Sequence, residues 1–198
     1  MNNDFLFADE QEAQLTMPAA TSGERWKVLI VDDEKEVHAV TRLALMELTF
    51  EGRGLDFLSA YSRQEAEQLV MEHNDLALVL LDVVMDTDDA GLKVAKFIRE
   101  QAQNQHARII LRTGQPGQAP ERYVVINYDI NDYKAKTELT SQKLFTCVMS
   151  ALRSYRDIIR VDAARKAAEH KLQQVFEQLE QNHPEIYQRI KSTLGKDE

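Results

Sequence analysis

The chain has 198 residues, of which 43% are hydrophobic and 29% charged, enough apolar material for one ordinary globular domain with further segments around it. Its formal net charge of −9 argues against a general nucleic-acid binder, because such proteins present a basic face to the phosphates. The single cysteine, Cys147, excludes a disulfide framework within the chain and fits a reducing compartment.

The N-terminal part of the sequence predicts an arm rather than an element. Residues 1–25 are polar and loop-like apart from the cluster Phe5-Leu6-Phe7, and we expect them to form a flexible arm. The acidic start lacks the basic region of a signal peptide. No apolar run approaches the roughly 20 residues that cross a bilayer. We therefore expect a cytoplasmic protein that does not engage a membrane.

Five predicted strands alternate with five predicted helices. Residues 27–31 (KVLIV) and 76–81 (LALVLL) are continuous apolar runs, which is typical of strands buried on both faces of a parallel sheet. The other predicted strands are 55–61, 108–111 and a short one within 129–136. The predicted helices are 35–49, 62–73, 91–103, a short fourth one after the 115–120 loop with Pro120 in its first turn, and a fifth one from Thr140 or Ser141.

Two of these helices carry more specific predictions. Ser62 and Glu65 have the spacing of a capping box, so the second helix should begin there. The first helix places most of its apolar residues on one side, which we expect to face the core: Val37, Val40, Leu43, Ala44, Met46 and Leu48.

The alternating pattern predicts an open parallel sheet covered by helices on both faces. In such sheets the functional crevice lies at the carboxyl ends of the strands. Four different strands deliver polar residues to that edge, and this convergence is stronger than any single motif: Asp32, Asp33, Asp82, Thr113 and Lys136.

Four segments in order give the chain a family resemblance. VLIVDDE, LVLLDVVM, the Arg-Thr-Gly after the fourth strand and DYKAK resemble the receiver domain of two-component response regulators, over residues 26–155. The resemblance implies a flavodoxin-like (βα)5 α/β fold, a doubly wound parallel sheet of strand order 2-1-3-4-5. The phrases DTDDAGL, LRTGQPGQAP and YDINDYKAKTELT are similar to a receiver subtype found N-terminal to cyclic-di-GMP enzymes or kinases.

The carboxylates suit phosphoryl transfer with a divalent cation. Asp82 follows a buried strand and is the candidate phosphoacceptor. Without the other site residues, the better interpretation would be an ordinary turn residue at the end of a strand. Three crowded carboxylates repel unless a hard cation such as Mg²⁺ joins them, although acids at 32–34 also suit a helix start. The resemblance implies that Asp33 ligates Mg²⁺ directly, that Asp32 acts mainly through water, and that the Val84 carbonyl is a further ligand.

The resemblance also assigns the remaining site residues. The Thr113 hydroxyl would donate to a phosphoryl oxygen, with Gly114 leaving room beside it. Lys134 and Lys136 compete for the phosphate-sensing role. We favour Lys136, because in the family an aromatic residue commonly lies three positions before that lysine, as Tyr133 does here. Strand alternation would also place Tyr133 and Lys136 on opposite sides of the strand. Tyr133 is the candidate switch aromatic, with ordinary packing as an equal alternative.

Three features depart from the family pattern. Thr137 stands where a proline normally follows the lysine, which affects the expected geometry of that peptide. The spacing from Asp82 to Gly91 is about one residue longer than usual, and residues 115–129 are unlike a standard fourth helix. We therefore expect an unusual signalling face near the fourth helix and the fifth strand.

The C-terminal part predicts a long helix. Apolar residues recur at three-four spacing over 151–179 and form a seam of about four heptads, weakened by Ser154 and Arg165. We expect this seam to form a homodimeric coiled coil, with a solvated monomeric helix as the alternative. Pro184 should interrupt the helix. The predicted divisions are a receiver at 26–155, a coiled-coil extension at 156–183 and a short helix or tail at 184–198.

The predicted function is that of a phosphoacceptor response regulator. A sensor histidine kinase or phosphotransfer protein would donate the phosphoryl group to Asp82, which would switch a partner or an attached module. No GGDEF-like segment, HD-type metal pair or convincing DNA-binding helix-turn-helix follows residue 155. We therefore expect either a fragment of a larger protein or a receiver that works alone. We expect no enzymatic activity beyond self-catalysed phosphoryl transfer and dephosphorylation. One alternative function is a haloacid-dehalogenase-like phosphohydrolase, but that family needs an acid/base aspartate where Val84 stands. Another alternative is a structural scaffold that is not phosphorylated.

Overall fold

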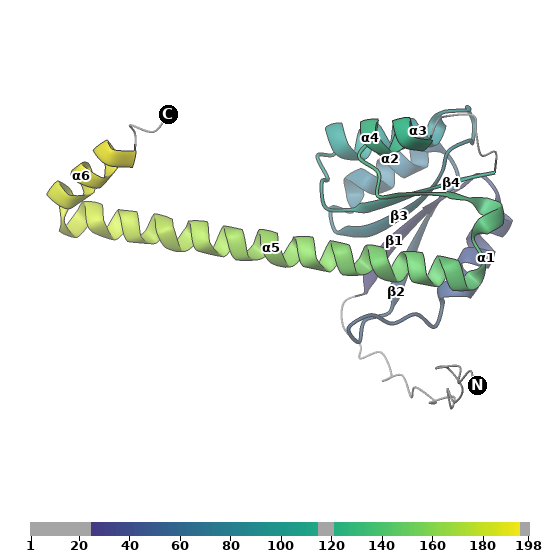
Figure 1. The fold of residues 1–198 in the computed structure, drawn as a ribbon, viewed down its shortest axis with the longest axis horizontal. Coiled ribbons are helices and arrows are strands. Elements are labelled where there is room, and N and C mark those ends of the chain that lie inside the picture. Colours follow the sequence, from purple (N-terminus) through teal and green to yellow (C-terminus); the bar gives the residue numbers. More distant parts are fainter. Residues whose placement is uncertain (1–24, 115–120, 195–198) are drawn as a thin grey trace, which may run out of the picture.

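The structure is a computed structural model that describes residues 25–114 and 121–194. Its centre is a parallel five-stranded sheet of order β2-β1-β3-β4-β5, which confirms the predicted flavodoxin-like topology (Figure 1). The strands are β1 (Trp26–Val31), β2 (Leu55–Ala60), β3 (Leu76–Asp82), β4 (Arg108–Thr113) and β5 (Asp132–Ala135). Residues 1–24 of the predicted arm at 1–25, and Pro120, lie outside the described residues.

Helices cover both faces of the sheet. They are α1 (Lys35–Leu45), α2 (Arg63–Glu72), α3 (Ala90–Glu100), α4 (Glu121–Asn127), α5 (Ser141–Asn182) and α6 (Pro184–Leu194). One apolar cluster joins the sheet to α2, α3 and α4, and a second joins its other face to α1 and α5 (Figure 1). Every residue of β3 is buried because both of its faces are covered, as its continuous apolar run predicts.

The predicted helix starts agree with the capping chemistry. The Ser62 hydroxyl accepts a hydrogen bond from the Glu65 amide at 3.2 Å, and the Glu65 carboxylate accepts one from the Tyr61 amide at 2.8 Å. Thr140 caps α5 in the same way, since its hydroxyl accepts from the Lys143 amide at 3.3 Å. Both helices therefore begin where the sequence places them.

The predicted core face of α1 is partly wrong, because Leu48 is buried and Ala44 packs against the core but three other members are exposed. Val40, Leu43 and Met46 are 65%, 70% and 67% exposed, whereas His38, Thr41 and Leu45 are buried. The reason is that two of the buried side chains satisfy polar partners inside the domain. His38 contacts the Asp32 carbonyl and the Ser59 hydroxyl at 2.8 Å each, and the Thr41 hydroxyl accepts from an arginine of β4. The helix also ends at Leu45 rather than at 49.

Helix α5 has a buried first part and a projecting second part. Its buried residues are Leu144, Val148, Ala151, Leu152 and Tyr155. Beyond them the helix runs clear of the sheet (Figure 1) and, over its 42 residues, is about 60 Å long. Ala151 therefore packs in the domain core and is not free for an intermolecular seam.

The end of α5 agrees with the predicted effect of Pro184. Helix α5 stops at Asn182, and α6 begins at Pro184. Helix α6 turns back toward α5, where the Phe176 and Tyr187 rings meet edge to face with centroids 6.4 Å apart. Within residues 25–114 and 121–194, no helix combines the length and the apolar character needed to cross a bilayer.

Candidate functional site

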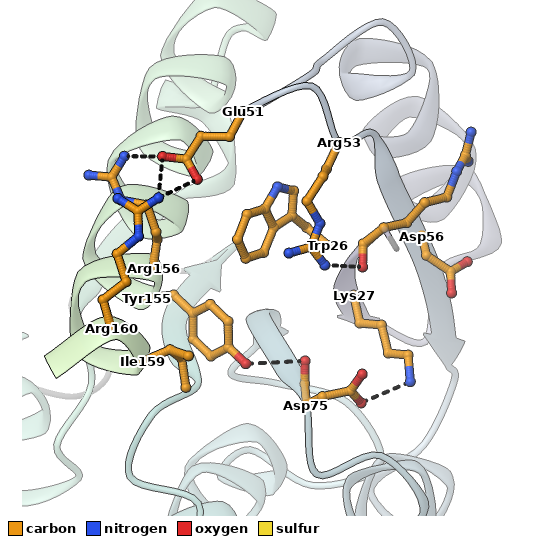
Figure 2. Close-up of a pocket in the computed structure, with 11 residues that line it drawn as sticks. Trp26, Lys27, Glu51, Arg53, Asp56, Asp75, Tyr155, Arg156, Ile159 and Arg160 are labelled. Atoms are coloured by element: carbon orange, nitrogen blue, oxygen red, sulfur yellow. Dashed lines mark hydrogen bonds and ion pairs between the residues drawn. The ribbon is translucent and has the colours of Figure 1, made fainter. Parts of the chain in front are cut away.

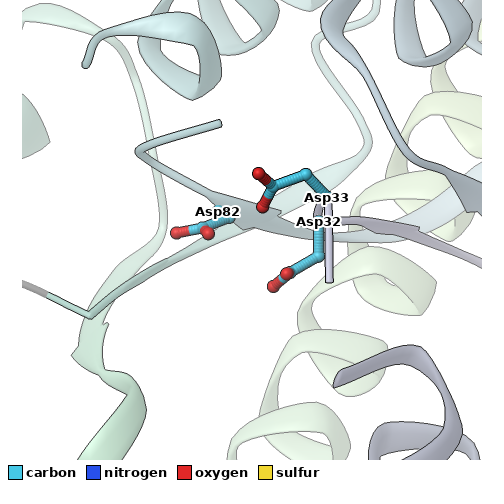
Figure 3. A group of neighbouring side chains, drawn as sticks. All are labelled: Asp32, Asp33 and Asp82. Atoms are coloured by element: carbon cyan, nitrogen blue, oxygen red, sulfur yellow. The ribbon is translucent and has the colours of Figure 1, made fainter. Parts of the chain in front are cut away.

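Three aspartates meet at the carboxyl edge of the sheet. Asp32 and Asp33 follow β1, Asp82 ends β3, and one carboxylate oxygen from each lies within 4.8 Å of the other two (Figure 3). They meet because β1 and β3 are parallel neighbours in the sheet. Asp32 and Asp82 are buried, whereas Asp33 is exposed and faces the solvent side of the cluster. The structure thus brings together all three of the predicted carboxylates.

Lys136 contributes a positive charge to this cluster. Its ammonium lies 2.8 Å from Asp82, 3.1 Å from Asp32 and 3.1 Å from Glu34. Lys134 instead pairs with Asp132 at 3.0 Å and is 38% exposed. The geometry therefore places Lys136, not Lys134, against Asp82. The alternation argument for this choice does not hold, because Lys136 lies beyond β5 in the 3₁₀ turn Lys136–Glu138.

Burial and charge act in opposite directions on these groups. Burial raises the pKa of Asp82 above its ordinary value; Lys136 opposes that rise, and the nearby Asp32 adds to it. Burial by itself would lower the pKa of Lys136, but the hydrogen bond and charge of Asp82 outweigh it, so the pKa of Lys136 is raised. The carboxyl of Asp82 thus has an unfavourable environment that a further positive charge would relieve.

The residues present fit a hard divalent cation. The Asp82 Oδ1 atom is buried and has no hydrogen-bond partner among the described residues, although Oδ2 is paired with Lys136. A buried carboxylate oxygen without a partner is costly unless a ligand satisfies it. The other two carboxylates each bring an oxygen atom within 4.8 Å of an Asp82 oxygen, and oxygen is the donor that Mg²⁺ prefers.

The other predicted site residues lie around this cluster. Thr113 is buried at the end of β4, beside Ala135 of β5 in the strand register. Val84 and Tyr133 are partly buried and pack against the apolar cluster under α2, α3 and α4. All of them therefore lie at or next to the same sheet edge, with Tyr133 on the α4 side.

One charged residue of the site was not predicted. Arg112 of β4 is buried, and its guanidinium lies 3.3 Å from the Asp32 carboxylate and 3.0 Å from the Thr41 hydroxyl. The sequence signal was present, because an arginine inside the buried run RIILRT needs a polar or acidic partner. The partner comes from a distant element, so the sequence does not identify it.

Gly91 supports the phosphoacceptor backbone, and we predict that Gly91→Ala disturbs it. A Cβ atom at this position would overlap the backbone carbonyl oxygen of Asp82, and the Gly91 amide donates to the Val83 carbonyl at 3.0 Å. Because this is backbone, the strand end or α3 must shift, at a cost of roughly 1–3 kcal/mol. Urea unfolding should show this loss, and calorimetry should show weaker Mg²⁺ binding.

Gly114 provides the matched control for that substitution. Among the described residues, a Cβ atom there would meet nothing within 4 Å, so Gly114→Ala should leave both the free energy of unfolding and the Mg²⁺ affinity close to the wild-type values. Equal effects of the two substitutions would contradict the supporting role of Gly91.

A hollow lies at the opposite edge of the sheet, beside residues 155–160 of α5. It has a volume of about 640 Å³ and is lined by aromatic and charged side chains, Trp26 and Tyr155 among them (Figure 2). Glu51 binds Arg156 at 2.8 Å and Arg160 at 3.1 Å, so acids and arginines pair across it. These contacts attach α5 to the domain where it begins to project.

Comparison with known proteins extends these observations. The family model of the response regulator receiver domain matches residues 28–148. The receiver domain of an HD domain-containing protein from Pseudomonas fluorescens Pf-5 has a TM-score of 0.56 and 23% identity, covering 68% of this chain and 99% of that one. A histidine-kinase receiver domain from Clostridium thermocellum has a TM-score of 0.55 and 19% identity, covering 64% and 97%. These structures show the fold.

A curated relative corrects one prediction and completes the family assignment. The 3'3'-cGAMP-specific phosphodiesterase 2 of Vibrio cholerae is 47% identical over 168 residues, which is 83% of this chain and 32% of that protein. The chain thus spans about a third of the relative's length. The prediction that the protein is not an enzyme is contradicted by this relative, which is a phosphodiesterase. Because the receiver match spans more than half of its residues, the chain belongs to the response regulator receiver domain family.

Proposed function

We propose that this protein is a phosphoacceptor response regulator in which Asp82 receives a phosphoryl group with the help of Mg²⁺. The observation that carries the proposal is the state of the Asp82 carboxylate. It is buried, one oxygen is ion-paired with Lys136 at 2.8 Å, and the other has no partner among the described residues. A carboxylate oriented by a fixed cation, with one oxygen left for a ligand, is suited to attack phosphorus.

Each surrounding residue has a role in this proposal. Asp33 ligates Mg²⁺ directly, Asp32 mainly through water, and the Val84 carbonyl adds a further ligand. When bound, the ion neutralises charge on the transferring phosphoryl group. The Thr113 hydroxyl and the Lys136 ammonium bind phosphoryl oxygens once Asp82 is modified, and Tyr133 reports the change on the α4–β5 side.

The phosphodonor is a sensor histidine kinase or a phosphotransfer protein. Helix α1 starts just after Asp32 and Asp33, so its outer face borders the acidic site. That face exposes Val40, Leu43 and Met46, apolar side chains that the domain itself does not cover. A donor that packs on this face near the start of α1 lies beside the acidic site, which makes the face the candidate docking surface.

The domain divisions and the output belong to the same proposal. We assign residues 26–155 to the receiver, 156–183 to a coiled-coil extension and 184–198 to a short helix or tail, in a cytoplasmic protein. The relative is a phosphodiesterase about three times as long as the matched region, which supports an output module attached to, or contacted by, this receiver. Phosphorylation would bias that module through an existing conformational equilibrium.

Incubation with Mg²⁺ and acetyl phosphate tests the phosphoacceptor. We expect one phosphoryl group per chain, on an adduct that hydroxylamine removes. Release of phosphate over many turnovers from small phosphoesters would instead indicate a haloacid-dehalogenase-like hydrolase. The absence of any adduct on the folded wild-type protein would indicate a scaffold.

The projecting part of α5 is the proposed dimer interface, and its apolar seam predicts a specific disruption. Val161, Leu172 and Val175 are at least half exposed. In a two-stranded coiled coil such residues pack against a second copy. Leu172→Glu combined with Val175→Glu places charges in that seam and should convert a dimer to a monomer in sedimentation equilibrium.

A control pair separates the seam from the charge alone. Ala167→Glu combined with Gln174→Glu adds the same charge on another side of the same exposed helix stretch. This pair should leave the sedimenting mass unchanged. A wild-type protein that sediments as a monomer at all concentrations would contradict the proposed dimer.

A further inference from the structure

Arg112 is an internal cation next to the phosphoacceptor. It directly precedes Thr113 on β4 and is only 3% exposed. In the sheet register it lies beside Asp82, and its carbonyl accepts from the Val83 amide at 3.0 Å. Two sides of its guanidinium are held, by the Asp32 carboxylate at 3.3 Å and by the Thr41 hydroxyl at 3.0 Å. The charge is therefore held in a fixed position next to Asp32 and Asp82.

Asp32 lies between this cation and the one from Lys136. Besides Arg112 it contacts Lys136 at 3.1 Å, and its Oδ1 atom accepts from the Glu34 amide at 3.1 Å. Asp32 is fully buried, so each of these partners offsets part of the cost of removing its charge from water. The two cations differ in position: Lys136 is partly exposed and reaches Asp82 from the rim, whereas Arg112 is enclosed.

We propose that Arg112 is a built-in countercharge of the phosphoryl-transfer site, which weakens the binding of Mg²⁺ and favours the phosphorylated state. This inference rests on the proposed function, since it assigns a residue to the same site. It follows from the sign of the charges. A fixed cation repels a divalent cation nearby, and it attracts the negative charge that a phosphoryl group brings to Asp82.

A purely structural arginine would act differently. If Arg112 only held Asp32 in place, its loss would weaken both Mg²⁺ binding and phosphoryl transfer, because Asp32 would be misplaced for both. A countercharge predicts opposite changes in the two quantities. The Thr41 hydroxyl provides the comparison, because it anchors the guanidinium without contributing charge.

The test uses the full chain with Arg112→Met, Arg112→Lys and Thr41→Val. Calorimetry without phosphodonor measures the dissociation constant of Mg²⁺, and mass spectrometry measures the rate of adduct formation from acetyl phosphate at saturating Mg²⁺. In Arg112→Met we expect Mg²⁺ to bind about tenfold more tightly and the adduct to form about tenfold more slowly. Arg112→Lys keeps the charge, and Thr41→Val keeps the arginine, so both should stay close to wild type in Mg²⁺ affinity.

Three outcomes decide the matter. Weaker Mg²⁺ binding in Arg112→Met overturns the countercharge and leaves a structural arginine. Equal changes in Arg112→Met and Thr41→Val also overturn it. Absence of an adduct on the wild-type protein contradicts the proposed function instead, and the Mg²⁺ titrations still report on the charge of Arg112. Circular dichroism confirms that each variant is folded before it is titrated.

Discussion

Replacing Asp82 by asparagine is expected to abolish phosphorylation. Wild-type protein incubated with Mg²⁺ and acetyl phosphate should gain the mass of one phosphoryl group, and Asp82→Asn should gain none. The amide keeps the shape of the side chain and a hydrogen bond to Lys136, but it lacks the nucleophilic oxygen whose buried position defines the site. Intact-mass spectrometry before and after hydroxylamine treatment measures the result.

An exposed acid of the neighbouring loop gives the matched control. Asp86→Asn removes the same charge a few residues away. Because Asp86 is exposed to solvent, which weakens the effect of its charge, the rate of adduct formation should stay within about twofold of wild type. An adduct of wild-type yield on Asp82→Asn would show that another residue, such as the exposed Asp33, accepts the phosphoryl group. That result would contradict the assignment of the acceptor.

The same substitution has a pH-dependent effect on stability. Burial raises the pKa of Asp82 in the folded protein, so the folded state binds a proton more readily than the unfolded chain does. The Asp82 carboxyl therefore makes the protein less stable as pH rises from the unfolded pKa to the raised folded value. Without Mg²⁺, Asp82→Asn should unfold at a higher temperature than wild type at neutral pH, and this advantage should shrink in acid.

Much of the fold follows from local sequence signals. The apolar runs that form β1 and β3 are too continuous for a half-exposed strand, and the caps at Ser62 and Thr140 fix two helix starts. The burial of α1 did not follow from hydrophobicity, because His38 and Thr41 take the inner face through hydrogen bonds to other elements. Those partners are set by tertiary structure, which a pattern of apolar residues does not contain.

The candidate site was likewise only partly predictable from the sequence. Asp32, Asp33 and Asp82 were predictable because parallel strands end at one edge, so residues just after them meet. Lys136, rather than Lys134, lies against Asp82, but the strand argument used to choose it failed because β5 ends at Ala135. Arg112 was missed because its acidic partner is far away in the sequence.

Lys136→Met should lower stability and slow phosphorylation together. The substitution removes the ammonium that lies 2.8 Å from Asp82 and 3.1 Å from Asp32, and leaves two buried carboxylates with one fewer cation. Loss of one partner of a buried ion pair costs roughly 3–5 kcal/mol, and we expect the lower end because Lys136 is partly exposed. The rate of adduct formation should fall at least about tenfold, since one stabilising charge is lost.

Lys134→Met is the matched control, and pH and Mg²⁺ supply two further readouts. Lys134 pairs with Asp132 near the surface, so its loss should change the unfolding free energy by less than about 1 kcal/mol. In Lys136→Met the pKa of Asp82 should rise further, so the folded variant takes up a proton and recovers stability as pH falls. Mg²⁺ should also restore part of the loss, because it supplies positive charge to the same carboxylates. Equal defects in the two lysine variants, or a Lys136→Met defect that neither acid nor Mg²⁺ relieves, would show that Lys136 does not act through the charge of Asp82.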